Sequence, residues 1–167
     1  NAAMFVAVGT GTNLQQNTAV GRDALRVTRY FGNTGIGSQA LRNDTAGSYN
    51  SALGYQAMFD NLSGDFNAAF GYQASLNNET GSNNTSIGAT ALDNNTTGSD
   101  NTAVGYNANV STGALTNATA IGANAFVTNN NSLVLGSVAG ANAATASTNV
   151  GIGTTTPRAR LHVVKDG

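Results

Sequence analysis

One five-residue phrase recurs along the chain at an almost constant spacing. It reads Asn-Thr-Ala-Val-Gly at residues 101–105, and related copies end at Gly21, Gly37, Gly54, Gly71 and Gly88. Looser copies end at Gly9, Gly122, Gly136 and Gly153, and most of these glycines keep the 17-residue interval that separates Gly54 from Gly71. A unit this short cannot bury a core alone, so neighbouring units must stack. The repeat therefore predicts a solenoid.

Several positions keep their residue type from copy to copy. The residue before the glycine is always apolar, as in Val20, Ile36 and Leu53, and the third residue after it is alanine from Ala24 to Ala139. We expect each coil to contain two short strands of about five residues joined by tight turns. The apolar column is then predicted to form an inner ladder, the alanine column to mark a close approach, and the Asn and Thr columns to hydrogen-bond along the stack.

Composition restricts the function classes. Only 9% of the 167 residues are charged, the net charge is −1, and there is no cysteine. These values argue against a coiled coil, an electrostatic nucleic-acid binder, a disulfide scaffold and a thiolate metal site. No apolar run approaches the roughly 20 residues of a membrane span, so we expect no membrane insertion. We also expect no cofactor and no metal.

The predicted fold is all-β, a parallel β-roll or solenoid with 17-residue coils, over positions 1–140. Residues 141–167 read as a transition segment that leads into a further domain, and both ends of the chain suggest a segment of a longer polypeptide. Because small residues dominate the columns, one roll buries little surface. Three rolls packed along one axis would share a core, and we expect a homotrimer.

The Asn-Thr-Ala-Val-Gly and alanine columns resemble the head repeats of trimeric autotransporter adhesins, the YadA-like heads. That resemblance implies a left-handed parallel β-roll and a trimer. The usual repeat of that family is shorter, close to the 14-residue step between Gly122 and Gly136, so the 17-residue coil departs from it by an inserted turn. The ending Val150–Pro157 and Leu161–Val163 resembles a segment of phage tail fibres and bacterial surface fibres. In those proteins it commonly precedes an endosialidase-type intramolecular chaperone, which would lie beyond Gly167.

These resemblances imply a structural or adhesive segment of a trimeric fibre, on a cell surface or in a virion tail, that attaches to a glycan or protein receptor. A purely structural spacer of a phage tail fibre is the alternative. Two groups of residues are candidate ligand contacts, because they interrupt the Asn/Thr turns or offer aromatic rings to sugars. They are Arg26, Arg29, Tyr30 and Phe31 near the start, and Tyr55, Tyr72 and Tyr106 just after the anchor glycines. For both groups an ordinary structural role, as solvated turns or as cover for an inter-chain groove, is at least as good an interpretation.

Other function classes fit less well. The phrases at 36–40 and 121–125 match the hexapeptide of left-handed β-helix acyltransferases, but only one hexad fits each coil and His162 lies in the terminal strand. General acid–base catalysis needs a histidine or paired carboxylates, and the acids stand singly in turns. We therefore expect no enzyme. A flat ice-binding face is disfavoured because Ser51 and Ala68 interrupt the threonine column, and the calcium-binding phrase of β-roll repeats is absent.

Overall fold

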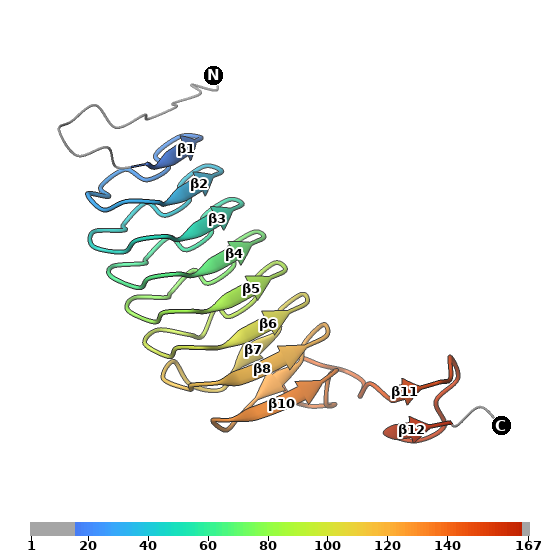
Figure 1. The fold of residues 1–167 in the computed structure, drawn as a ribbon. Helices are drawn as coiled ribbons and strands as arrows, with labels where there is room; N and C mark the ends of the chain where they lie inside the picture. Colours follow the sequence, from blue (N-terminus) through green and yellow to red (C-terminus); the bar gives the residue numbers. More distant parts are fainter. Residues whose placement is uncertain (1–15, 165–167) are drawn as a thin grey trace.

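The computed structural model describes residues 16–164, which form an all-β molecule without a helix. Its main sheet has eight parallel strands in chain order (Figure 1). They are β1 (Thr18–Val20), β2 (Thr34–Ile36), β3 (Ser51–Leu53), β4 (Ala68–Phe70), β5 (Thr85–Ile87), β6 (Thr102–Val104), β8 (Ala118–Ile121) and β10 (Ser132–Leu135). The predicted copy that ends at Gly9 lies outside the described residues.

Each strand pairs with the strand one coil further along. Thr34 aligns with Ser51, Ser51 with Ala68 and Ala68 with Thr85, and hydrogen bonds between coils keep the same 17-residue step. Equivalent positions therefore lie one above another along a rod, as Figure 1 shows. The predicted β-solenoid with 17-residue coils is confirmed.

The prediction of two five-residue strands in each coil is wrong. The strands of the first six described coils have three residues, and within residues 16–164 a second short strand in a coil occurs only at β7 (Asn109–Val110) and β9 (Phe126–Val127), which pair with each other. On that side of the other coils, two residues per coil take the left-handed conformation, for example Gln56 at φ 54° and Met58 at φ 52°. Such a backbone is not extended, yet it still bonds from coil to coil, as Met58 N–H does to the carbonyl of Ala74 at 2.9 Å.

The predicted inner apolar ladder is also wrong, because the column before the anchor glycine faces outward. Ile36, Leu53, Phe70 and Ile87 are 37–49% exposed, whereas the residue before each of them is buried. Side chains alternate between the two faces of a strand, so only one of the two sets can point inward. The inward set consists of Ala19, Gly35, Ala52, Ala69, Ser86, Ala103 and Ala120.

The interior is held by asparagine ladders. Asn67 Oδ1 accepts a hydrogen bond from the backbone N–H of Asn84 at 2.8 Å, and Asn67 Nδ2 donates to the carbonyl of Gly81 at 2.8 Å. The same pair of bonds is made one coil earlier by Asn50 and one coil later by Asn84. A second buried column, Asn61, Asn78 and Asn95, bonds amide to amide. The predicted hydrogen bonding along the stack is confirmed for the Asn columns and is wrong for the Thr column, since within residues 16–164 the hydroxyls of Thr34, Thr85 and Thr102 point outward on the strands and make no hydrogen bond.

Alanines and large apolar residues fill the rest of the interior. The alanines predicted at a close approach, from Ala40 to Ala125, are fully buried, and so are Leu41, Met58 and Leu92 next to them. Ala139, the last of the predicted column, is exposed. In one coil serines replace two apolar side chains, and Ser75 donates to Ser86 at 2.8 Å. Because the two serine hydroxyls bond to each other, neither is left without a partner in the interior of the roll.

The anchor glycines stack directly on one another at the end of each strand. A Cβ on Gly54, which has φ 140°, would lie 2.2 Å from the carbonyl oxygen of Gly71. Only glycine combines this backbone conformation with so close an approach between coils.

The chain leaves the roll after β10. Strands β11 (Val150–Ile152) and β12 (Leu161–Val163) form a separate parallel pair beside the end of the roll (Figure 1). Gly153 ends a looser sequence copy of the repeat within the transition segment, and in the described residues the strand before it pairs with β12 and not with the main sheet. The predicted strand near the C-terminus is confirmed by β12.

Candidate functional site

The outer face of the main sheet carries a continuous apolar column. Its register is fixed by the strand pairing, and it runs through Val20, Ile36, Leu53, Phe70, Ile87, Val104, Ile121 and Leu135. Six of these eight side chains are at least 37% exposed. Seven strand spacings of about 4.8 Å make the column about 34 Å long. A contiguous exposed apolar strip of this kind is uncommon on the surface of a monomeric protein.

The three predicted tyrosine contacts lie along one edge of this face, each directly after an anchor glycine. Tyr55, Tyr72 and Tyr106 are 45%, 52% and 62% exposed. The rings of Tyr55 and Tyr72, one coil apart, are stacked with centroids at 5.6 Å. Tyr106 stands two coils beyond Tyr72, because the intervening coil has Ala89 at this position. The structure thus brings two of the tyrosines together and separates the third.

A second aromatic group lies at the other end of the strands and joins the two predicted contacts Tyr30 and Phe31. Phe31 makes an edge contact with Tyr49 at 6.3 Å, and Tyr49 stacks on Phe66 at 5.0 Å. Tyr49 and Phe66 were missed by the sequence interpretation. Both precede the Asn of the repeated phrase, and this recurrence of an aromatic residue in two consecutive coils was the available indication.

The backbone at this aromatic corner is in an uncommon conformation. Tyr49 and Phe66 have φ of 59° and 57°, in the left-handed region that bulky residues seldom adopt. Gly32, one coil before Tyr49, leaves room for its ring, since a Cβ there would lie 2.6 Å from Tyr49 Cδ1. Both rings are more than half exposed, so the conformation holds them at the surface.

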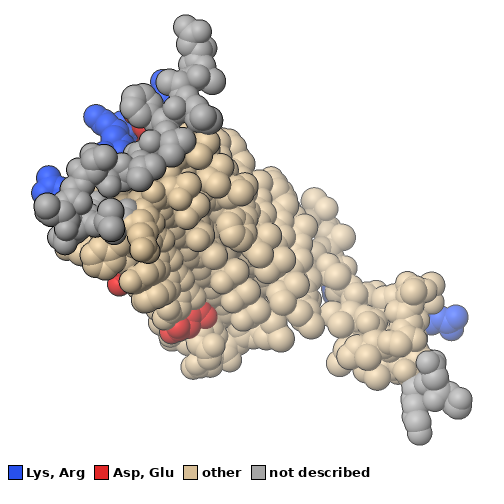
Figure 2. All heavy atoms as spheres, turned by 45° about the horizontal axis from the view of Figure 1, so that its top comes forward, with Lys and Arg blue, Asp and Glu red and all other residues tan. Residues whose placement is uncertain are grey.

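The basic residues gather at the ends of the molecule. Arg26 and Arg29, both predicted contacts, are exposed in the first described coil, together with Arg22. Figure 2 shows basic side chains at both ends of the molecule and, on the face in view between them, few acidic ones. Arg22 Nε lies 3.9 Å from Asp23 Oδ2, and both groups are exposed enough that this ion pair contributes little stability.

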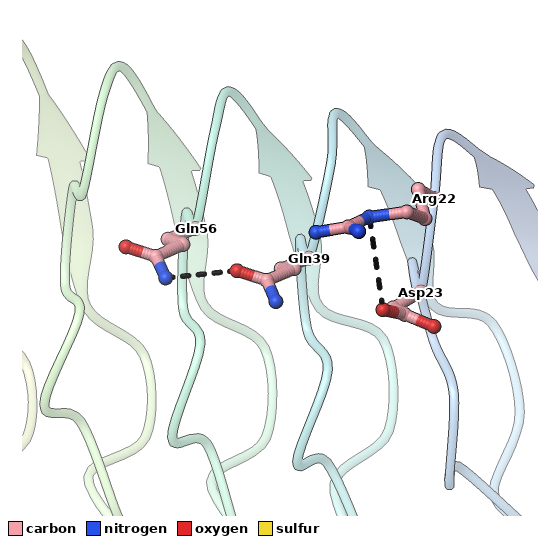
Figure 3. A network of polar contacts seen from close by, with 4 residues as sticks. All are labelled: Arg22, Asp23, Gln39 and Gln56. Atoms are coloured by element: carbon pink, nitrogen blue, oxygen red, sulfur yellow. Dashed lines mark hydrogen bonds and ion pairs between the residues drawn. The ribbon is translucent and has the colours of Figure 1, made fainter. Parts of the chain in front are cut away.

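A glutamine ladder runs beside the tyrosines. Gln56 Nε2 donates to Gln39 Oε1 at 2.9 Å, and Gln73 Nε2 donates to Gln56 Oε1 at 2.8 Å. Figure 3 shows the start of this ladder next to Arg22 and Asp23. Because every amide repeats at the coil spacing, the ladder fixes the direction in which each carbonyl oxygen points.

One carboxylate is buried at the N-terminal end of the second asparagine column. Asp44 accepts hydrogen bonds from Thr28 at 2.7 Å, Asn33 at 3.2 Å, Asn61 at 3.0 Å and the backbone of Gly47 at 3.0 Å. Burial raises the pKa of Asp44 above its ordinary 3.8, although the bonds from Thr28, Asn61 and Gly47 act in the opposite direction. Burial likewise raises the pKa of Asp93.

Other functional groups are sparse among residues 16–164. No three His, Cys, Asp or Glu side chains there are grouped so as to hold a metal ion, and none of these residues forms a helix able to cross a membrane. His162 lies in β12, where its Nδ1 accepts a hydrogen bond from the backbone of Arg158 at 3.2 Å. Its place in the terminal strand is the one expected from the sequence.

Comparison with known proteins identified no similar protein. No protein-family model, no curated protein and no solved structure matches this chain. The repeat, the outer face of the sheet and the aromatic residues are therefore the features that bear on function.

Proposed function

We propose that this chain is a structural and adhesive segment of a trimeric surface fibre, in which three left-handed rolls pack side by side. The apolar column on the outer face of the main sheet is the observation that carries the proposal. A soluble monomer rarely exposes a contiguous apolar strip of this length, and a second and third copy would cover it.

The chemistry of the column suits contact between identical chains. It contains only Val, Ile, Leu and Phe, and it is flanked by an outward column of mostly Thr, with Ser51, Ala68 and Leu133, which carries no charge. Three such faces around one axis would form a dry core along the rod, so that small buried alanines inside each roll are sufficient. The repeated phrases, which resemble YadA-like heads, support the same assembly.

The proposed location is extracellular, on a cell surface or in a virion tail fibre, and the proposed partner is a cell-surface glycan or protein receptor. The two aromatic groups support the adhesive role, because exposed rings with polar neighbours are common in recognition surfaces. A spacer without a receptor is the second candidate, and the long stretch of regular coils without basic residues favours it.

Light scattering on the purified chain tests the assembly. We expect three times the mass of the 16.8 kDa chain, and we expect Ile87→Asp in the middle of the apolar column to shift it toward the monomer. Ser63→Asp, at an exposed turn away from the strands, is the matched control and should leave the mass unchanged. A folded wild-type monomer would contradict the proposal.

A further inference from the structure

We propose that the gap in the tyrosine column at Ala89 is a binding site for one pyranose ring of a glycan. The site, called the Ala89 gap, consists of Tyr72, Ala89, Thr90 and Tyr106, with Gln73 and Asn107 beside it. It rests on the adhesive function proposed above and gives that function a place on the molecule.

The spacing of the flanking tyrosines fits a single ring. Tyr72 and Tyr106 are two coils apart, which separates their backbones by about 9.6 Å. One ring in van der Waals contact with both faces needs about 7–8 Å, which is less than this separation, and two rings need about 10.5–12 Å, which is more, so the gap admits one ring and not two. Tyr55 already stacks on the other face of Tyr72, so the face of Tyr72 toward Ala89 is the one left for a ligand.

The glutamine ladder ends at the same coil. Thr90 occupies the position of Gln56 and Gln73, and its hydroxyl donates to the carbonyl of Ala89 at 2.8 Å instead of continuing the ladder. One coil therefore has Ala-Thr where two earlier coils have Tyr-Gln. The two smaller side chains leave the aromatic and the amide column open at one level of the rod.

The amides on either side point their carbonyl oxygens toward this level. Gln73 Nε2 donates toward the N-terminus, to Gln56, whereas Asn107 Nδ2 donates toward the C-terminus, to Asn124 Oδ1 at 2.9 Å. Within residues 16–164, no donor hydrogen-bonds to Gln73 Oε1 or Asn107 Oδ1. A ligand that fits must supply hydrogen-bond donors at its edge.

The spacing of the tyrosines and the two amide oxygens together favour a sugar as the ligand. A pyranose presents C–H groups on its faces, which pack against the aromatic rings of Tyr72 and Tyr106, and hydroxyl donors around its edge, which suit the two amide oxygens. No charged residue lies in the Ala89 gap, so a neutral hexopyranose fits better than a sialic acid or a phosphorylated glycan.

A variant that fills the gap tests the proposal. Ala89→Tyr would continue the column, and tyrosines one coil apart are already accommodated at Tyr55 and Tyr72. On an array of immobilised lactose, maltose and cellobiose, we expect the wild-type chain to bind and Ala89→Tyr to bind at least tenfold more weakly. Ala123→Tyr, in the same column but beyond Tyr106, is the matched control and should bind like the wild type.

A second variant, Tyr106→Ala, removes one wall and should also weaken binding at least tenfold, with circular dichroism confirming that each variant is folded. Absence of wild-type binding, or equal binding by Ala89→Tyr, overturns the site. Light scattering on the same samples separates this outcome from the fibre proposal: a trimer that binds no sugar refutes the Ala89 gap alone, and a monomer refutes the trimeric fibre whatever it binds.

Discussion

The two faces of the main sheet carry different kinds of side chain. The inner face presents Asn, Ala, Ser and Gly, and the outer face presents Thr and a column of Val, Ile, Leu and Phe. In most sheets the larger apolar residues point toward the core of their own chain. Here the inward positions of the strands carry small residues, buried large side chains such as Met58 come from other parts of the coil, and hydrogen-bonded asparagines add to the stability of the interior. Polar side chains can therefore hold an interior when each repeats at a fixed spacing and bonds to its own copy.

The largest expected effect of a single change comes from the inner face. Asn84→Ala would leave the backbone N–H of Asn101 buried without its partner, whereas the carbonyl of Gly98 would lose one of two bonds and keep the one from Asn95 Nδ2 at 2.9 Å. An unpaired buried N–H costs about 1–3 kcal/mol and a lost hydrogen bond about 1 kcal/mol, so we expect a loss of about 2–4 kcal/mol in the free energy of unfolding. Thr85→Ala, the next residue on the outer face, should change it by less than about 0.5 kcal/mol. Denaturant unfolding of both variants measures the difference, and equal losses would refute the sidedness of the strand.

A pair of neighbouring alanines provides a second comparison. Ala69 is fully buried on the inner face, whereas Ala68 is half-buried on the outer face. Ala69→Leu should destabilise the roll by about 1–3 kcal/mol through overpacking. Ala68→Leu should leave thermal unfolding of the roll unchanged or raise its midpoint, because it adds apolar surface to the proposed interface. A midpoint that falls more for Ala68→Leu than for Ala69→Leu would contradict the assignment.

The smallest expected effect concerns pH. The pKa values of Asp44 and Asp93 are both raised by burial, so the folded state binds a proton more tightly than the unfolded state. The free energy of unfolding should then fall as pH rises from 3.8 through the raised values, and increase again when the solution is acidified. Thermal unfolding between pH 4 and 7, about the range in which raised carboxyl groups titrate, checks this expectation.

The double variant Asp44→Asn with Asp93→Asn serves as the control for that titration. It carries no acid at either position, so its unfolding midpoint should depend less on pH than that of the wild type. A slope of the same size in both proteins would assign the pH dependence to other groups.

Much of the fold could be predicted from the sequence, because the repeat fixes register. The spacing of the anchor glycines predicted parallel coils, and the buried Ala57 belongs to the alanine column that was predicted at a close approach. The repeat did not predict which alternate residues of each strand face the interior. In Asn-Thr-Ala-Val-Gly either alternate set can point inward, and the usual preference for buried valine selected the wrong one.

The candidate site was predictable only in part. The tyrosines were found because they share a position after the glycine, but stacking depends on which coils carry them, and Ala89 interrupts the column. Tyr49 and Phe66 precede the repeated phrase and were overlooked. Their contact at 5.0 Å follows from the left-handed backbone at that corner, which the residue types do not suggest.

The asparagine ladders also bear on how such a rod can change in length. The Asn of each coil accepts a hydrogen bond from a backbone N–H of the next coil and donates one to a glycine carbonyl of that same coil. Duplication or deletion of a whole coil therefore leaves every type of contact in place and alters the rod only by one step of about 4.8 Å. The length of the rod can therefore change by whole coils, in evolution or by design, without a change in its interior.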